Sequence, residues 1–308
     1  MSKFRAILIA GPTASGKSDA ALALAEKLDG IVINADSKQV YRDLRVLSAR
    51  PSAEDEARAP HALYGFVPSE TAYSVGQWLE DVARAISQAQ AEGRTPIIAG
   101  GSGLYFKALL EGLSPVPDIP EGVRTRWRDA ANTNTPAELH DLLRERDPGM
   151  ADQLRPSDPQ RIVRALEVVD ATGQSLAEWQ QKSGSPILDA DEAARIFVTR
   201  PREELYARIN ARFDTMLSHG ALEEVEALVA KDLDPDLPVM RAHGVRPLMQ
   251  VLSGATTREE AIEQVKTETR RYAKRQETWA KSNMISWKRI EKKDSESFAS
   301  NIFSFIDV

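Results

Sequence analysis

The sequence contains no cysteine, which excludes disulfide bonds, thiolate zinc sites and cysteine nucleophiles. Histidine is nearly as scarce, because only four are present and they are widely scattered, so a histidine metal site is not expected. No apolar run approaches the roughly 20 residues that span a bilayer, and the first residues lack the pattern of a signal peptide. We therefore expect a cytoplasmic protein without a membrane segment.

Basic residues are outnumbered in this chain. The 40 lysines and arginines against 46 aspartates and glutamates give a net charge of -6 at pH 7. Such a balance argues against a protein that coats nucleic acid in general, although it permits a local basic groove. The 308 residues, of which 42% are hydrophobic, are enough for one large domain with an insertion or for two domains.

The apolar patterns of the first hundred residues predict a parallel sheet. Residues 4–10 form a short apolar run, which leads into a glycine-rich loop and an alanine- and leucine-rich helix to about residue 28. A second apolar run follows at 30–34, and this strand, loop, helix, strand order is typical of parallel strands. The same reasoning predicts a helix at 73–93 and strands at 95–103 and 195–199.

The glycine-rich loop, "GPTASGKS", matches the pattern G-x-x-x-x-G-K-[ST] in full. Glycines let successive backbone N–H groups point at phosphate oxygens, and the helix that follows adds its positive end. Lys17 supplies a mobile charge and the Ser18 hydroxyl is a magnesium ligand. The predicted phosphate or diphosphate site therefore comprises Gly11, Pro12, Thr13, Ala14, Ser15, Gly16, Lys17 and Ser18. The motif does not choose between ATP and another diphosphate.

A proline-rich stretch at 113–120 marks a domain boundary. The residues beyond it look wholly helical, with three matches to the capping-box pattern: Thr135 with Glu138, Ser157 with Gln160, and Ser175 with Glu178. Helical patterns return at 202–219, 221–231 and 258–281. We predict an α/β fold: a P-loop NTPase-like parallel-sheet core with C-terminal helices, formed by residues 1–114 and 191–308, and a helical insertion domain at 115–190.

Asp36 ends the second predicted strand. The carboxyl ends of strands face the ligand crevice in open α/β sheets, so this acid is expected near the phosphate loop and over the acceptor. The alternative is a turn aspartate that caps the segment after it.

Arg212 is expected on the inward face of a helix, in a pattern formed by Leu205, Ile209, Arg212 and Met216. An arginine there needs an anion, because a buried charge without a partner is costly. The alternatives are an arginine that extends to solvent, or one paired with Asp214 or Glu204.

Five ordered motifs, covering roughly residues 6 to 288, resemble the tRNA dimethylallyltransferase family, also called tRNA isopentenyltransferases. They are "GPTASGKS" followed by "DSKQVY", then "PIIAGGSGLYFKALLEGL", "SDPQRIVRALEV", "ELYARINARFDTML" and "TRRYAKRQETW". The lack of cysteine excludes the C-terminal zinc finger of some eukaryotic members and favours a bacterial type.

The resemblance implies that a dimethylallyl group moves from dimethylallyl diphosphate to N6 of the adenosine beside a tRNA anticodon, with release of diphosphate. ATP is not the donor, although the loop belongs to the class that binds ATP. Asp36 would accept the N6 proton, and general-base help is typically worth about 10²- to 10⁴-fold. Lys17, Thr13 and Mg²⁺ held by Ser18 would stabilise the leaving diphosphate, which Arg212 would also contact.

The resemblance also implies contacts to a tRNA anticodon stem-loop from which the target base is extruded. The implied residues are Asp36, Ser37, Lys38, Gln39, Ser102, Arg124, Gln160, Arg161, Ile162, Val163 and Arg164. Arg161 and Arg164 share a helix face, which suits phosphate contacts but also fits a solvated face. We expect a monomer.

Three other functions fit parts of the sequence. They are an ATP-dependent small-molecule or nucleoside kinase, a non-catalytic P-loop protein that binds RNA, and a prenyltransferase that acts on free AMP or ATP. The motif order and the long insertion favour tRNA. The sequence departs from the family at "PHALYGF", around His61, and at "AHGVRPL", which introduces Pro247. Tyr41 has no assigned role beyond packing.

Overall fold

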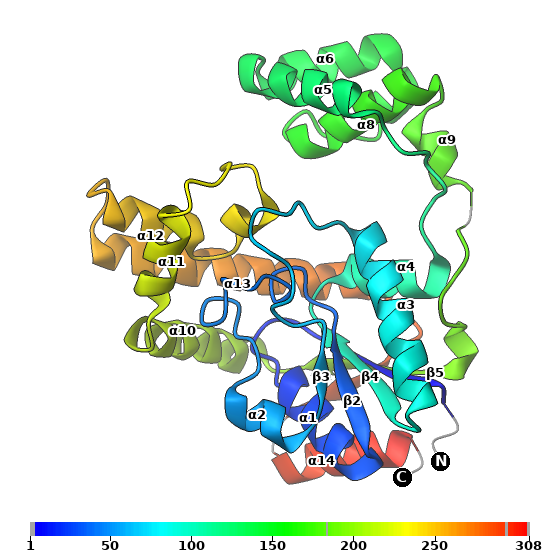
Figure 1. The fold of residues 1–308 in the computed structure, drawn as a ribbon, viewed down its shortest axis with the longest axis vertical. Helices are drawn as coiled ribbons and strands as arrows, with labels where there is room; N and C mark the ends of the chain where they lie inside the picture. The colour runs from blue at the N-terminus through cyan, green and yellow to red at the C-terminus, as the bar shows by residue number, and fades with distance from the viewer. Residues whose placement is uncertain (1–3, 183, 293–294, 307–308) are drawn as a thin grey trace. The chain divides into compact units, whose positions relative to one another are not determined.

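A single parallel sheet forms the centre of the larger part of the chain, to which both the N-terminal and the C-terminal residues belong (Figure 1). The computed structural model describes residues 4–182, 184–292 and 295–306. Within them six strands lie in the order β3-β2-β4-β1-β5-β6, each parallel to its neighbours. The strands are β1 (Ala6–Ala10), β2 (Gly30–Asn34), β3 (His61–Ala62), β4 (Thr95–Gly100), β5 (Ala193–Thr199) and β6 (Lys288–Glu291). The predicted α/β fold with a parallel sheet is confirmed.

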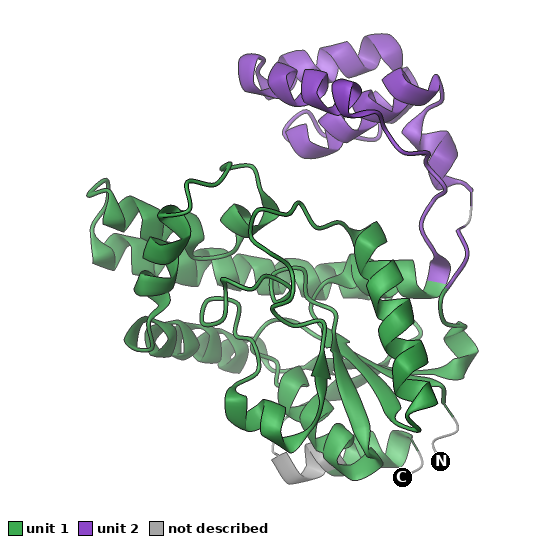
Figure 2. Cartoon of the chain, in the orientation of Figure 1, with its two compact units in different colours: residues 1–110, 187–308 green, residues 111–186 purple. Residues whose placement is uncertain are grey.

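The chain divides into two compact units (Figure 2). The first contains the sheet and comprises residues 1–110 and 187–308, and the second comprises residues 111–186. Helices of the first are α1 (Lys17–Leu28), α2 (Ala53–Arg58), α3 (Val75–Ala91), α4 (Gly103–Glu111), α10 (Arg202–Ser218), α11 (Ala221–Val229), α12 (Val245–Leu252), α13 (Arg258–Asn283) and α14 (Ser295–Phe305), with short 3₁₀ turns η1 (Ala190–Glu192) and η2 (Pro238–Arg241).

Alternation along the strands builds two hydrophobic layers, one on each face of the sheet. In β1, Ile7 and Ile9 pack with α1 and α14, whereas Leu8 and Ala10 pack with α3, α4 and the end of α13. Both faces are covered, so β1 is buried throughout, as expected for a central parallel strand. This burial fixes the central strands, and with them the loops at their carboxyl ends.

A smaller core lies beside the sheet. Tyr41 is fully buried in it, and its hydroxyl donates to the carbonyl oxygen of Thr71 at 3.2 Å. α11 and α12 supply its other side. The packing role expected for Tyr41 is therefore confirmed. Pro247, which had no assigned role, is buried in α12 near the start of the helix.

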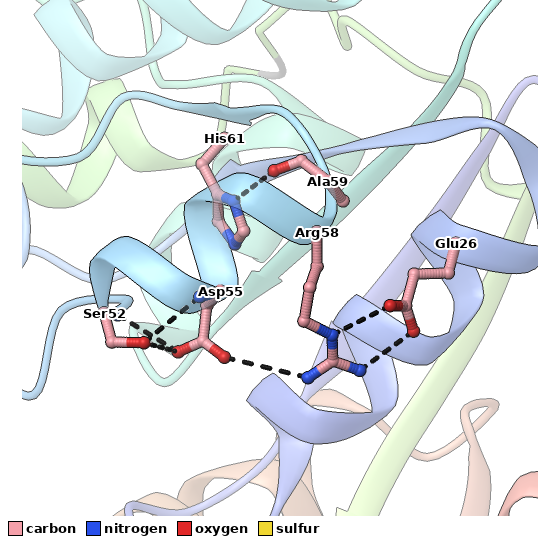
Figure 3. Close-up of polar contacts among 6 residues, drawn as sticks. All are labelled: Glu26, Ser52, Asp55, Arg58, Ala59 and His61. Carbon is pink, nitrogen blue, oxygen red and sulfur yellow. Dashed lines mark hydrogen bonds and ion pairs between the residues drawn. The ribbon is translucent and has the colours of Figure 1, made fainter.

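The edge of the sheet is anchored by polar contacts of α2 (Figure 3). Ser52 and Asp55 form a capping box at the start of this short helix. Arg58 donates to both carboxylate oxygens of Glu26 on α1, at 2.8 and 2.9 Å. His61 starts β3, and its Nδ1 lies 2.8 Å from the backbone oxygen two residues earlier. The imidazole of His61 is therefore held by a contact with its own local backbone.

The second unit is helical and has its own core. Its helices are α5 (Glu121–Thr133), α6 (Pro136–Arg146), α7 (Pro148–Ala151), α8 (Pro159–Thr172) and α9 (Leu176–Gln180). Trp127 and Leu143 are buried at its centre. Trp127 donates its indole N–H to Asp170 at 2.9 Å, and Arg126 and Arg146 pair with the same carboxylate. The sequence had placed a helical domain at 115–190.

The three capping predictions of this unit had different outcomes. Thr135 and Glu138 form the expected capping box. Ser157 does not cap α8: Asp158 does so instead, because Pro159 occupies the first helical position and its neighbour accepts from the backbone of Arg161. Ser175 caps α9, but its side chain accepts from the second helical residue and no reciprocal bond is formed.

Candidate active site

The carboxyl ends of four adjacent strands meet at one edge of the sheet. The phosphate loop follows β1, Asp36 follows β2 closely, the "GGSG" turn follows β4, and Arg200 follows β5. A Cβ on Gly100 would stand 2.0 Å from the carbonyl oxygen of Ala35, so only glycine allows the turn to approach β2 this closely. Residues that are far apart in the sequence therefore meet at the carboxyl ends of the strands. Ligands bind at this edge of the sheet in open α/β folds.

The phosphate loop is held from outside by side chains of later segments. Arg200 is buried and donates to the carbonyl oxygen of Ser15 at 3.0 Å, and Arg208 donates to that of Ala14 at 3.2 Å. Ala14 adopts a left-handed backbone conformation, with φ of 64°, which is uncommon for alanine and needs such support.

One predicted ligand of the loop is turned away from the pocket. The Ser15 side chain is fully buried and its hydroxyl has no hydrogen-bond partner. Its Oγ lies 2.8 Å from the point where a Cβ of Gly11 would stand, beneath the loop. Ser15 was predicted as part of the phosphate site, but it does not line the pocket, and its side chain packs against Gly11 instead.

A pocket of about 430 Å³ opens beside the loop. Its lining is Thr13, Ala14, Gly16, Lys17, Ser18, Asp19, Asp36, Gln39, Ser48, Ala49, Arg208, Ala211, Arg212 and Thr215. The loop forms one end, and small side chains of α10 and of residues 48–49 form a further wall. The pocket thus brings together loop residues, Asp36 and Arg212, which the sequence had singled out separately.

Arg212 is half-buried and extends from α10 to the phosphate loop. Its guanidinium donates to the Thr13 hydroxyl. Neither acid considered as its partner contacts it: Glu204 pairs with Arg200, and Asp214 pairs with Lys266. Burial lowers the pKa of Arg212 to about 10, although the charge of Asp36 opposes the shift. The arginine therefore stays protonated at neutral pH with its charge directed at the pocket.

Lys17 has an unusually low proton affinity for a lysine. Burial lowers its pKa to about 8, the charge of Asp36 raises it in part, and Arg212 lowers it further. Its Nζ lies 3.4 Å from the carbonyl oxygen of Pro12 and has no carboxylate partner at hydrogen-bonding distance among the described residues. A cation so poorly solvated is stabilised by an anion that enters the pocket.

Asp36 is both a turn residue and a pocket residue. Its Oδ1 accepts from the backbone N–H of Lys38 at 2.9 Å, as the turn alternative proposed. Its own N–H donates to Oδ1 of the buried Asn34 at 2.8 Å, which fixes the backbone direction at the end of β2. The two interpretations therefore coincide: the turn bond orients the carboxylate, and the carboxylate lines the pocket.

The negative charge of Asp36 also acts on three buried phenols. The pKa values of Tyr64, Tyr105 and Tyr272 are raised, first by burial and then by the negative charge of Asp36. These tyrosines stay neutral at physiological pH. Asp36 thus lies among neutral hydroxyl groups and cations.

The three residues after Asp36 are engaged with the protein itself. Ser37 donates its N–H to the Ser102 hydroxyl at 3.0 Å. Lys38 donates its Nζ to the carbonyl oxygen of Pro238 at 2.7 Å, and burial lowers its pKa to about 8. The Gln39 amide donates to the carbonyl oxygens of residues 48 and 49, at 2.9 and 2.7 Å. These bonds use the amide nitrogen of Gln39, which still lines the pocket, so its contact with tRNA stays a prediction.

The remaining predicted tRNA contacts lie in the helical unit. Gln160, Arg161 and Arg164 are exposed on α8. Arg161 pairs with Asp158 and Arg164 with Glu167, each at the i, i+3 spacing. Ile162 is fully buried in the core of the unit, and Val163 is partly buried against it, so these two apolar side chains serve packing. Arg124 is partly buried on α5. The prediction of an Ile162 side-chain contact is not retained.

Sequence reasoning missed several residues of the site. Arg208 lies four positions before Arg212 on the same helix face, so the spacing contained a signal for it. Glu224 on α11 accepts from the backbone of residues 45–47, which leads into the pocket wall at 48–49. Gln276 on α13 contacts the phosphate loop. Gln276 lies within the quoted stretch "TRRYAKRQETW", but no local pattern indicated the contacts of these two residues, because their partners lie far away in sequence.

The fold and the pocket define an α/β enzyme in which a glycine-rich loop after β1 and an acid after β2 line one pocket. Comparisons with known proteins identify the family. A family model described as IPP transferase matches residues 39–283, and one described as isopentenyl transferase matches residues 4–64. A tRNA dimethylallyltransferase of Methylocella silvestris is 52% identical over 298 residues, 97% of this chain and 98% of that protein. One of Parvibaculum lavamentivorans is 52% identical over 98% of this chain and 96% of that protein.

Solved structures agree with this result. A tRNA isopentenylpyrophosphate transferase from Bacillus halodurans is 32% identical with a TM-score of 0.70, covering 98% of this chain and 95% of that one. A eukaryotic dimethylallyltransferase acting on tRNA is 26% identical with a TM-score of 0.79, covering 96% and 77%. The chain therefore belongs to the tRNA dimethylallyltransferase family of prenyltransferases. None of the helices in the described part of the chain combines the length and apolar character that a bilayer crossing requires.

Proposed function

We propose that this enzyme transfers the dimethylallyl group of dimethylallyl diphosphate to N6 of the adenosine beside a tRNA anticodon. The observation that carries the proposal is one pocket that joins a cationic phosphate loop to the carboxylate of Asp36. The loop supports binding of the leaving diphosphate, and the acid supports proton removal from the attacking amine. The C–N bond forms as the C–O bond to diphosphate breaks, and the N6 proton passes to Asp36.

The donor diphosphate is proposed to lie against the phosphate loop. Lys17 and Arg212 direct their charges into the pocket, and Thr13 offers its hydroxyl beside Arg212. Charge builds up on the diphosphate as the C–O bond breaks, so these cations stabilise the transition state more than the bound donor. Arg208 lines the same end of the pocket and adds a further positive charge.

Mg²⁺ is proposed to bind with the donor. Ser18 and Asp19 supply oxygen atoms at the lining of the pocket, which suits a cation that takes few protein ligands and several phosphate oxygens. Among the described residues no group of three acids or histidines forms a complete metal site. Ser18 would therefore hold Mg²⁺ together with the diphosphate, and the ion would neutralise charge on the leaving group.

Acceptor binding is proposed to involve the segment after β2 and the arginines of α8. Asp36 accepts the proton of an amine whose lone pair is delocalised into the adenine ring, and its fixed orientation supports this task. Arg161 and Arg164 are exposed and suit phosphate contacts. Each is now paired with a nearby acid, and a tRNA phosphate would replace that acid as its partner. We propose that the enzyme acts as a monomer, and a tRNA acceptor supports a cytoplasmic location.

The test of the function is a donor assay. Purified protein, Mg²⁺, dimethylallyl diphosphate and unmodified tRNA are expected to yield N6-prenylated adenosine and diphosphate, detected by mass spectrometry of digested tRNA. ATP labelled in its terminal phosphate serves as the competing donor. Transfer of that label to an acceptor, without prenyl transfer, would instead establish the kinase alternative.

Donor affinity is expected to fall as the pH rises through about 8. The pKa of Lys17 is about 8 in the free enzyme, and a bound diphosphate favours the protonated form. Above that pH, binding must take up a proton, so the Kd rises by up to about tenfold per pH unit. Calorimetric titration with dimethylallyl diphosphate measures this, since its phosphate groups do not titrate in the range. Lys17→Met should bind more weakly and with a flatter profile; an equal slope in both proteins would exclude Lys17 as the titrating group.

Removing the two exposed arginines of α8 is expected to weaken tRNA binding. Each phosphate contact that is lost removes roughly 0.7 to 0.9 from the slope of log affinity against log salt concentration. Arg161→Ala combined with Arg164→Ala should therefore flatten that slope, as measured by fluorescence anisotropy across a salt series. Arg84→Ala with Arg94→Ala removes the same charge from ion-paired residues of the sheet unit and controls for net charge. Identical slopes in all three proteins would refute the contacts.

A further inference from the structure

Gln276 bridges two loops that lie far apart in the sequence. It extends from α13, and its Oε1 accepts from the backbone N–H of Thr13 at 3.0 Å. Its Nε2 donates to the carbonyl oxygen of Gly101 at 2.9 Å. One amide therefore uses its acceptor on the phosphate loop and a donor on the turn after β4.

Each of these partners belongs to one half of the site. The Thr13 hydroxyl is held by Arg212 at the donor end. On the other side, Ser102 follows Gly101, donates its N–H to β2 at Ala35, and accepts from the N–H of Ser37 beside Asp36. Gln276 is thus linked by hydrogen bonds to the donor loop and, through the turn, to the segment that orients the catalytic carboxylate.

The approach of Gln276 to this turn is close. A Cβ on Gly101 would stand 2.4 Å from Nε2 of Gln276 and 3.4 Å from Oδ2 of Asp36. The amide and the carboxylate therefore lie on the same side of this residue, and any side chain there would separate them. Glycine at 101 is required for the contact between α13 and the "GGSG" turn after β4, residues 100–103, which we call the acceptor turn.

A neutral amide of this length satisfies both partners with a single group. Lysine and arginine have no acceptor for the Thr13 N–H, and glutamate, when ionised, has no donor for the Gly101 carbonyl. A glutamate would also place a negative charge beside a loop that holds diphosphate. Asparagine is one methylene shorter. The two bonds thus explain the residue type at 276, which neither the phosphate-loop pattern nor the acceptor segment accounts for.

We propose that Gln276 is a positioning residue that sets the separation between the phosphate loop and the acceptor turn, and so between the reacting carbon of the donor and the amine above Asp36. The inference rests on the proposed function. Reacting atoms about 3 to 3.5 Å apart are needed for efficient transfer, and a misplacement of about 1 Å costs up to roughly 100-fold. Gln276 acts on the rate through geometry and need not touch either substrate.

The test separates rate from binding. Gln276→Met keeps the size of the side chain and removes both hydrogen bonds. We expect kcat to fall about tenfold or more, while KM for dimethylallyl diphosphate and for tRNA changes by less than about threefold. Gln264→Met is the matched control: this glutamine lies on the same helix and is exposed, and its side chain donates a hydrogen bond to Glu268. The control should retain the wild-type kcat.

Gln276→Glu provides a second variant, since it keeps the acceptor for Thr13 and loses the donor for Gly101. It should also lower kcat, and its charge should raise KM for the donor. Wild-type kcat in either folded variant, or a loss confined to KM or to the fraction of folded protein seen by circular dichroism, would overturn the proposal. If the wild-type protein transfers no prenyl group, the proposed function fails instead, so the two failures are distinguishable.

Discussion

Asp36→Asn is expected to slow the chemical step by about 100-fold or more while tRNA binding is largely kept. Asparagine is the same size, and its Oδ1 still accepts from the N–H of Lys38, so the turn after β2 is preserved. What disappears is the negative charge that we propose takes the proton from N6. The measurement is a single-turnover rate with donor and tRNA both saturating, together with the Kd of tRNA.

The charge change itself requires a control. Asp36 helps to keep Lys17 and Lys38 protonated, so its loss lowers the pKa of both lysines and weakens donor binding above neutral pH. The assay is therefore run with excess donor at or below pH 7. Asp29→Asn removes an exposed carboxylate that pairs with Arg94, outside the pocket, and should leave the rate unchanged. A near-normal single-turnover rate in Asp36→Asn would remove Asp36 as the base.

Local patterns were sufficient for the residues that a short segment positions by itself. The loop "GPTASGKS" contains its own strand, turn and helix, so Lys17 could be placed at a helix start from sequence alone. Asp36 follows a strand of five residues, and the rule for carboxyl ends of parallel strands located it near the loop. Arg212 came from a helical period of apolar neighbours, two of which are buried as expected.

The errors concern side chains whose partners are distant in sequence. The bonds that Gln39 and Lys38 form within the protein were not anticipated, because their acceptors, near residue 48 and at Pro238, come from loops whose approach no local pattern predicts. Ile162 was predicted to contact tRNA because it belongs to the continuous run 160–164. The helical period of α8 places its side chain in the core instead. Ser15 illustrates the same limit inside the loop, where close packing against Gly11 decides the direction of the hydroxyl.

Missed elements have a related cause. β6 has only four residues, and its pairing with β5 rather than its composition makes it a strand. α12 begins after Gly244 and contains Pro247 in its first turn, where proline is tolerated, so the proline that suggested a disruption is compatible with a helix. α12 packs against α11 and α13, and β6 pairs with β5, so each gains its structure from partners that a window of sequence does not contain.

Arg212→Met is expected to lower kcat/KM for the donor by roughly 100-fold or more. The guanidinium is half-buried at the pocket and its bond to the Thr13 hydroxyl orients it, so little reorganisation is needed as charge develops on the diphosphate. Arg212→Lys keeps a charge but loses the planar pair of donors, and should recover only part of the activity. Steady-state kinetics with varied donor measures both. Arg202→Met, which removes an exposed arginine at the start of the same helix, is the control.

The order of the activities of the wild type, Arg212→Lys and Arg212→Met tests the role assigned to the charge of Arg212. If Arg212 binds the donor equally before and during transfer, KM rises and kcat is unchanged. If it stabilises the leaving group, as its contact with Thr13 in the phosphate loop indicates, kcat falls and the lysine variant lies between wild type and methionine. Equal activity of the methionine and wild-type proteins would reduce Arg212 to a support for the phosphate loop, and would leave Lys17 as the principal cation of the donor site.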